Sequence, residues 1–143
     1  ILFLNTMIGA TLSSSQSITA SGSYQKINTT NGVKSLGSSF SVTSGDITLG
    51  GTNKIFEITY SVQFTRSSSG SSAITFQMYN TTGGGAIGNS TAKSEKTLVT
   101  DTVSWTFYGV INSSTTIYVR VLTPSVNITI DSCNITAKEM GSI

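Results

Sequence analysis

The stretch IFEITYSVQFT, residues 55–65, alternates apolar and polar side chains along its whole length. One face carries aromatic and branched residues, and the other carries glutamate, glutamine, serine and threonine. Because successive side chains of a β-strand point to opposite sides, this period of two predicts a half-buried strand. Similar runs return at 74–78, 103–111, 117–121 and 126–130, and no helix-period stretch competes with them. The sequence therefore predicts an all-β sandwich or barrel.

Turn-forming residues separate the expected strands. They lie at 30–32, 44–46, 67–72, 83–85 and 112–114, and all are rich in glycine, serine, threonine or asparagine. Strands at this spacing are typical of sandwiches and jelly rolls, and a length of 143 residues fits a single domain over residues 1–143. The expected strands cover residues 1–4, 17–20, 24–28, 40–43, 47–49, 55–65, 73–79, 98–111, 116–122, 127–131 and 134–138.

The composition excludes several classes of partner. Serine and threonine make up about a third of the chain, whereas charged residues make up only 10%, with a net charge of +2. The basic residues are scattered singly instead of forming a stripe, so we expect no nucleic-acid binding. The apolar opening, residues 1–12, is shorter than the roughly 20 residues that span a bilayer and lacks a basic start, so we expect no membrane insertion.

The residues that most enzymes need are missing or scattered. The chain has no histidine, which removes serine–histidine and cysteine–histidine catalysis and histidine-ligated metals. Its six acidic residues are isolated in sequence, and a catalytic pair brought together by folding is the minor alternative. Cys133 is the sole cysteine and lies in a strand-like run, which favours a small buried hydrophobe over a reactive thiol. We expect no enzyme activity, no metal and no cofactor.

The segment Asn80–Lys96 is the longest stretch without an evident strand pattern. Seventeen irregular residues are uncommon in a compact domain unless they bind a partner or pack against a neighbour. We therefore expect a binding loop here, and the alternative is a simple crossover. Its polar candidates for contact are Asn80, Thr82, Asn89, Lys93 and Lys96.

Two neighbouring strands are apolar on both faces. In the first, Val103, Trp105, Phe107 and Ile111 form the expected core face, and two other apolar residues project the opposite way. In the next strand the core face is Ile117, Val119 and Val121, again with apolar residues opposite. A single domain of this length has no third layer to cover a second apolar face, so the simplest explanation is that a second copy of the chain packs against it. The expected subunit-interface residues are Tyr108, Val110, Tyr118, Arg120 and Leu122.

The order of these patterns resembles the C1q/TNF-like jelly-roll domains found in fibres, spikes and decoration proteins of phages and other viruses. Such domains carry a Tyr-x-Lys-aliphatic strand, matched by Tyr24, Lys26 and Ile27, and a Lys-aromatic start of the longest strand, matched by Lys54 and Phe56. The chain departs from their pattern at 113–115, where Ser-Ser-Thr replaces the usual Gly-Asp. The resembling stretches are 17–27, 40–64, 74–90, 102–121 and 126–140.

The resemblance implies a homotrimer around a threefold axis, exposed on a virion surface. It suggests a capsid decoration, head-fibre or spike protein that binds the major capsid protein or other virion proteins. An alternative within the fold is the tip of a tail fibre, where residues 80–96 contact a host cell-surface glycan. An alternative from another class is an extracellular pilus or thread, in which residues 1–12 insert into the next subunit as a donor strand.

Overall fold

The computed structural model describes residues 7–34, 40–50, 53–67, 73–92, 100–111 and 113–142. Every helix or strand assigned within these ranges is a β-strand, as the sequence predicts. The described ranges contain no helix with the length and apolar character needed to cross a membrane. The strands are β1 (Met7–Thr11), β2 (Gln16–Ile18), β3 (Gln25–Lys26), β4 (Thr30–Lys34), β5 (Phe40–Thr43), β6 (Asp46–Leu49), β7 (Lys54–Arg66), β8 (Ile74–Asn80), β9 (Gly85–Ala92), β10 (Thr100–Ile111), β11 (Thr115–Leu122) and β12 (Ile128–Ser142).

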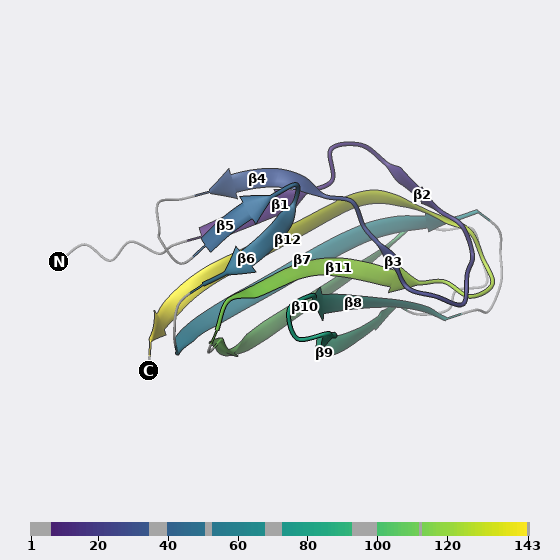
Figure 1. Ribbon diagram of the computed structural model, residues 1–143. Helices are drawn as coiled ribbons and strands as arrows, with labels where there is room; N and C mark the ends of the chain where they lie inside the picture. Colours follow the sequence, from purple (N-terminus) through teal and green to yellow (C-terminus); the bar gives the residue numbers. More distant parts are fainter. Residues whose placement is uncertain are drawn as a thin grey trace.

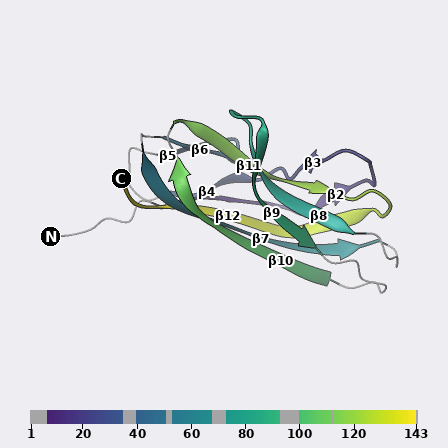
Figure 2. The ribbon, with the colours of Figure 1, turned by 90° about the horizontal axis from the view of Figure 1, so that it is seen from below.

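These strands form two antiparallel sheets that pack face to face (Figure 1). The first sheet has the order β10-β7-β12-β1-β4, and β2 also pairs with β12. The second sheet has the order β5-β6-β11-β8-β9, and β3 also pairs with β11. The long strands β10, β7 and β12 run side by side in Figure 2. Since the chain crosses repeatedly between the sheets, the predicted jelly-roll sandwich is confirmed.

The core lies between the inner faces of the two sheets. In β7 every second side chain is fully buried, and the same holds for the inner face of β11. Phe64 of the first sheet and Phe76 of the second lie with ring centroids 5.1 Å apart. Burying such a side chain stabilises the fold by roughly 1.5 to 3 kcal/mol. The buried hydrophobic residues of these two strands are Phe56, Ile58, Tyr60, Val62, Phe64, Ile117, Val119 and Val121.

The prediction of an irregular loop at Asn80–Lys96 is wrong in its described part. Residues 81–84 form a tight turn, and β9 then pairs with β8 from Asn80↔Gly85 to Ile74↔Ala92. This strand is the edge of the second sheet. Residues 93–96 lie outside the described ranges.

The turn expected at 30–32 is also wrong, since these residues belong to β4. Gly32 lies so close to β1 that a Cβ atom there would stand 2.7 Å from the carbonyl oxygen of Gly9. Glycine is therefore needed for close approach of two strands instead of for a turn. The expected strands at 127–131 and 134–138 are one strand, β12, with a bulge between Ile130 and Ser132. The strand β1 had not been expected, and residues 1–4 lie outside the described ranges.

Candidate functional site

The outward face of the first sheet carries an exposed apolar patch. Tyr108 is 66% exposed, Val110 39% and Met140 50%, and these are the exposed large hydrophobic residues among those described. Val110 pairs with Ile55 across β10 and β7, and Ile55 pairs in turn with Gly141, the residue after Met140. The three exposed residues therefore lie at one end of the same sheet, where three long strands meet. We call Tyr108, Val110 and Met140 the apolar patch.

Much of the rest of this outward face is made of small hydroxyl side chains in rows across the strands. Thr59 and Thr106 share a hydrogen bond of 3.1 Å, and the Ser104 hydroxyl donates to the Ser61 hydroxyl at 3.3 Å. Further along the sheet, the Thr11 hydroxyl donates to Asn134 Oδ1 at 2.9 Å. These bonds link strands β1, β12, β7 and β10 in neighbouring pairs. The face is therefore mostly polar, and the charged residues Glu57 and Lys138 lie on it in register with Tyr108.

The outward face of the second sheet holds an aromatic and cationic cluster around Arg120. The Arg120 guanidinium lies 4.2 Å from the ring centroid of Tyr24 and 3.9 Å from that of Tyr79. Its Nε donates to Gln77 Oε1 at 2.7 Å. Tyr118 packs edge-on against Tyr79, with centroids 5.5 Å apart. These half-buried side chains are covered by contacts within the chain itself.

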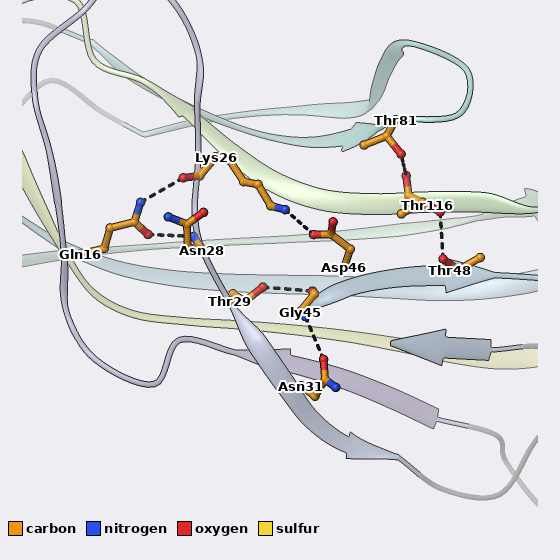
Figure 3. A network of polar contacts seen from close by, with 10 residues as sticks. All are labelled: Gln16, Lys26, Asn28, Thr29, Asn31, Gly45, Asp46, Thr48, Thr81 and Thr116. Atoms are coloured by element: carbon orange, nitrogen blue, oxygen red, sulfur yellow. Dashed lines mark hydrogen bonds and ion pairs between the residues drawn. The ribbon is translucent and has the colours of Figure 1, made fainter. Parts of the chain in front are cut away.

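A network of polar contacts links residues 26–31 to β2 of the first sheet and to the β5–β6 hairpin of the second (Figure 3). Lys26 Nζ forms an ion pair of 2.7 Å with Asp46, and it also lies 4.9 Å from the Tyr118 ring centroid. The Gln16 side chain bonds the backbone on both sides of Ile27: it donates to the Lys26 carbonyl at 3.1 Å and accepts from the Asn28 N–H at 2.8 Å. The result is a fixed segment beside β11, which positions Tyr24 next to Arg120.

The structure does not bring the five expected interface residues onto one surface. Tyr108 and Val110 project outward from the first sheet, whereas Tyr118, Arg120 and Leu122 project outward from the second. The expectation of one shared surface is therefore wrong, because β10 and β11 follow each other in sequence but belong to different sheets. The second group already contacts residues of its own chain, and the role of each group at a subunit interface stays a prediction.

The expected binding residues in the described part of 80–96 hold the hairpin turn together. Asn80 Oδ1 accepts from the N–H groups of Thr82 at 2.9 Å and Gly83 at 3.0 Å. The Thr82 hydroxyl accepts from the Thr116 N–H at 3.2 Å, which ties the turn to β11. Asn89 lies in β9, the strand that pairs with β8. Lys93 and Lys96 lie outside the described ranges. A role for these residues in binding a ligand stays a prediction.

Two shallow hollows on the surface are lined by residues without charged side chains. One, of about 290 Å³, is lined by small residues of β1, β4 and β12, among them Gly9, Gly32 and Thr136. The other, of about 640 Å³, is lined by residues 28–31 and Ser44. Neither brings together acidic, basic or nucleophilic groups that would act on a substrate.

Cys133 and Tyr60 carry titratable groups that are buried in the core. Cys133 is 1% exposed, and burial raises the pKa of its thiol to about 12, so the prediction of a small buried hydrophobe is confirmed. Burial, and secondarily the nearby Cys133, raises the pKa of the Tyr60 hydroxyl well above its usual range. Both groups therefore stay protonated near neutral pH. Within the described ranges no three side chains of histidine, cysteine, aspartate or glutamate are placed to hold a metal ion.

Comparison with known proteins places the fold. No protein-family model matches the chain, and no curated protein matches it. The crystal structure of murine APRIL at pH 5.0 superposes with a TM-score of 0.68 over 96% of this chain and 100% of its own, at 7% identity. Eiger TNF from S. frugiperda has a TM-score of 0.66 over 96% of this chain and 95% of its own, at 10% identity.

A third similar solved structure is a vertex protein. The PRD1 vertex protein P5 superposes with a TM-score of 0.57 over 95% of this chain and 97% of its own, at 13% identity. Each match extends over nearly the whole of both chains, while the sequence identity is low. The likeness therefore concerns the arrangement of the strands, and it agrees with the two antiparallel sheets described above: the chain has the C1q/TNF-like jelly-roll fold.

Proposed function

We propose that the protein is a virion structural protein that assembles as a homotrimer and acts by surface complementarity, without catalysis. The observation that carries the proposal is the apolar patch, in which Tyr108, Val110 and Met140 lie together at one end of the first sheet. Exposed large hydrophobic residues that cluster, instead of lying singly, mark interaction sites. The C1q/TNF-like domains that the sequence resembles bury aromatic residues of one sheet against neighbours around a threefold axis.

The neighbouring polar face suits the same role. Its hydroxyl rows are linked within the sheet and carry little charge, so they present a low desolvation cost at a subunit contact. A contact of standard size buries about 800 Å² per partner, and apolar area contributes about 25 cal/mol per Å². That contribution is large enough to offset the several kcal/mol of rigid-body entropy lost on association.

A place on the virion surface is supported by the likeness to the PRD1 vertex protein P5 and by the resemblance to viral fibre, spike and decoration domains. We infer that the trimer binds the major capsid protein or another virion protein through surfaces that the subunit contact leaves free. The proposed position is outside the cell, on the particle.

Light scattering over a dilution series tests the assembly. We expect a stable mass near three times the 15.0 kDa of the chain, which Tyr108→Ala lowers toward the monomer value. Tyr118→Ala is the matched control, because it removes the same side chain from the outward face of the second sheet.

Each other outcome overturns part of the proposal. A monomeric wild-type chain rejects the trimer, and an open-ended polymer favours the donor-strand filament. A trimer that Tyr118→Ala disrupts and Tyr108→Ala leaves intact moves the subunit contact to the second sheet.

A further inference from the structure

Arg120 is held in one orientation by three neighbours. Tyr24 reaches it from the segment beside β3, which pairs with one edge of β11, and Tyr79 reaches it from β8 at the other edge. Gln77, directly opposite Arg120 in the β11–β8 pair, accepts the hydrogen bond from Nε. The two aromatic rings cover the guanidinium and Gln77 fixes its plane, so the two terminal Nη groups form the remaining donor edge.

This guanidinium has no carboxylate partner in the described part of the chain. Lys26, the nearest other cation of the cluster, is already paired with Asp46 at 2.7 Å. Arg120 makes its hydrogen bond to the neutral amide of Gln77 and its other contacts to aromatic rings. The cluster therefore presents one oriented positive charge that no acidic side chain among the described residues neutralises.

We propose that Arg120 binds the carboxylate of a monocarboxylated sugar on the outward face of the second sheet. The Nη edge of a guanidinium forms two parallel hydrogen bonds with the two oxygens of a carboxylate. The rings contact the guanidinium through its face, which leaves the in-plane donor edge for an anion with two oxygens. Because the guanidinium is already oriented, little side-chain entropy is lost on binding.

The surroundings of Arg120 fit a sugar better than a polyanion. A single free positive charge matches a ligand with a single negative charge, whereas nucleic acid or a sulfated polymer needs several cations. The polar groups on the side chains that contact the guanidinium are the hydroxyls of Tyr24 and Tyr79 and the amide of Gln77, and such groups suit the hydroxyls of a sugar. The proposal does not depend on the trimer, since the apolar patch lies on the other sheet.

Saturation-transfer NMR with the full chain tests this site. The probes are glucuronate and N-acetylneuraminate, each compared with its uncharged methyl ester, and acetate and inorganic phosphate serve as simple anions. We expect both sugar acids to bind, and acetate, phosphate and the esters to bind at least about tenfold more weakly. Arg120→Lys keeps the charge but loses the planar fork, so it should weaken sugar-acid binding at least about tenfold.

Two control variants distinguish binding at Arg120 from a nonspecific effect of the protein's charge. Lys138→Gln removes a cation from the outward face of the first sheet and should leave binding unchanged. Glu95→Gln replaces the acidic residue that lies outside the described ranges, and it should also leave binding unchanged. An unchanged thermal unfolding temperature in Arg120→Lys shows that a loss of binding is not a loss of folding.

Several results overturn the proposal. These are the absence of sugar-acid binding, equal binding of acetate or phosphate, and equal binding by Arg120→Lys. Tighter binding by Glu95→Gln also overturns it, because the chain's own carboxylate would then be the natural occupant. The failure of this site is distinguishable from a failure of the proposed trimer, since the mass of the wild-type chain is measured separately.

Discussion

At the residue scale, Tyr60 places a polar group in the apolar core. Tyr60 belongs to the apolar face of β7, and its ring packs against Trp105 with centroids 5.8 Å apart. Its hydroxyl is fully buried and has no hydrogen-bond partner in the described part of the structure. A buried hydroxyl without a partner loses its hydrogen bonds to water and forms no hydrogen bond within the protein, which destabilises the folded state.

The change Tyr60→Phe should therefore stabilise the fold. We expect the free energy of unfolding to rise by about 1 kcal/mol, because the ring contacts stay and the unsatisfied hydroxyl disappears. Urea denaturation at one fixed protein concentration measures the effect. Tyr118→Phe, at a half-buried position on the second sheet, is the control and should change stability little. A loss of more than about 1 kcal/mol in Tyr60→Phe would mean that the hydroxyl has a partner.

At the element scale, the β5–β6 hairpin depends on its two-residue turn. Ser44 and Gly45 have φ values of 49° and 80°, and Thr43 pairs with Asp46 on either side of them. Two consecutive positive φ values define the turn type whose twist suits a tight hairpin. A Cβ atom at Gly45 would also collide with the backbone of Thr29, so the glycine is needed for space as well as for conformation.

Two glycine substitutions separate these effects. Gly45→Ala should lower the free energy of unfolding by about 2 to 4 kcal/mol, through backbone strain and the collision with Thr29. Gly84→Ala has a similar φ of 70°, but its Cβ would meet only the Tyr79 hydroxyl at 4.0 Å. We expect it to cost about 1 kcal/mol, from the backbone alone. Equal losses in urea denaturation would show that the contact with Thr29 relaxes freely.

At the scale of the whole molecule, the two outward faces serve different proposed contacts. The apolar patch and hydroxyl rows of the first sheet suit a second copy of the chain, whereas the oriented Arg120 of the second sheet suits a small acidic ligand. The edges β9 and β10, which belong to different sheets, lie against each other and close one side of the sandwich. Subunits joined through the first sheet would leave the Arg120 cluster open to solvent.

Assembly through the first sheet makes stability depend on concentration. The melting temperature of the wild-type chain should rise with protein concentration, because association stabilises only the folded form. Tyr108→Ala should remove most of this dependence, and differential scanning calorimetry at several concentrations measures it. The control Tyr118→Ala should keep the same slope as the wild type. A melting temperature that is independent of concentration in the wild type would contradict the subunit contact.

The sequence by itself determined the fold class and the inward faces of the long strands. In residues 55–65 and 117–121 the period of two is a local property, so it identifies the buried side chains before their partners are known. The same reasoning missed β1, β4 and β9, which contain glycine and lack a clear alternating pattern, so that pairing with a neighbour makes the strand. Only the tertiary structure placed Tyr108 and Tyr118 on opposite faces of the molecule, and only it surrounded Arg120 with Tyr24 and Tyr79. The order of strands in a sheet depends on contacts between distant residues, and no local pattern encodes that order.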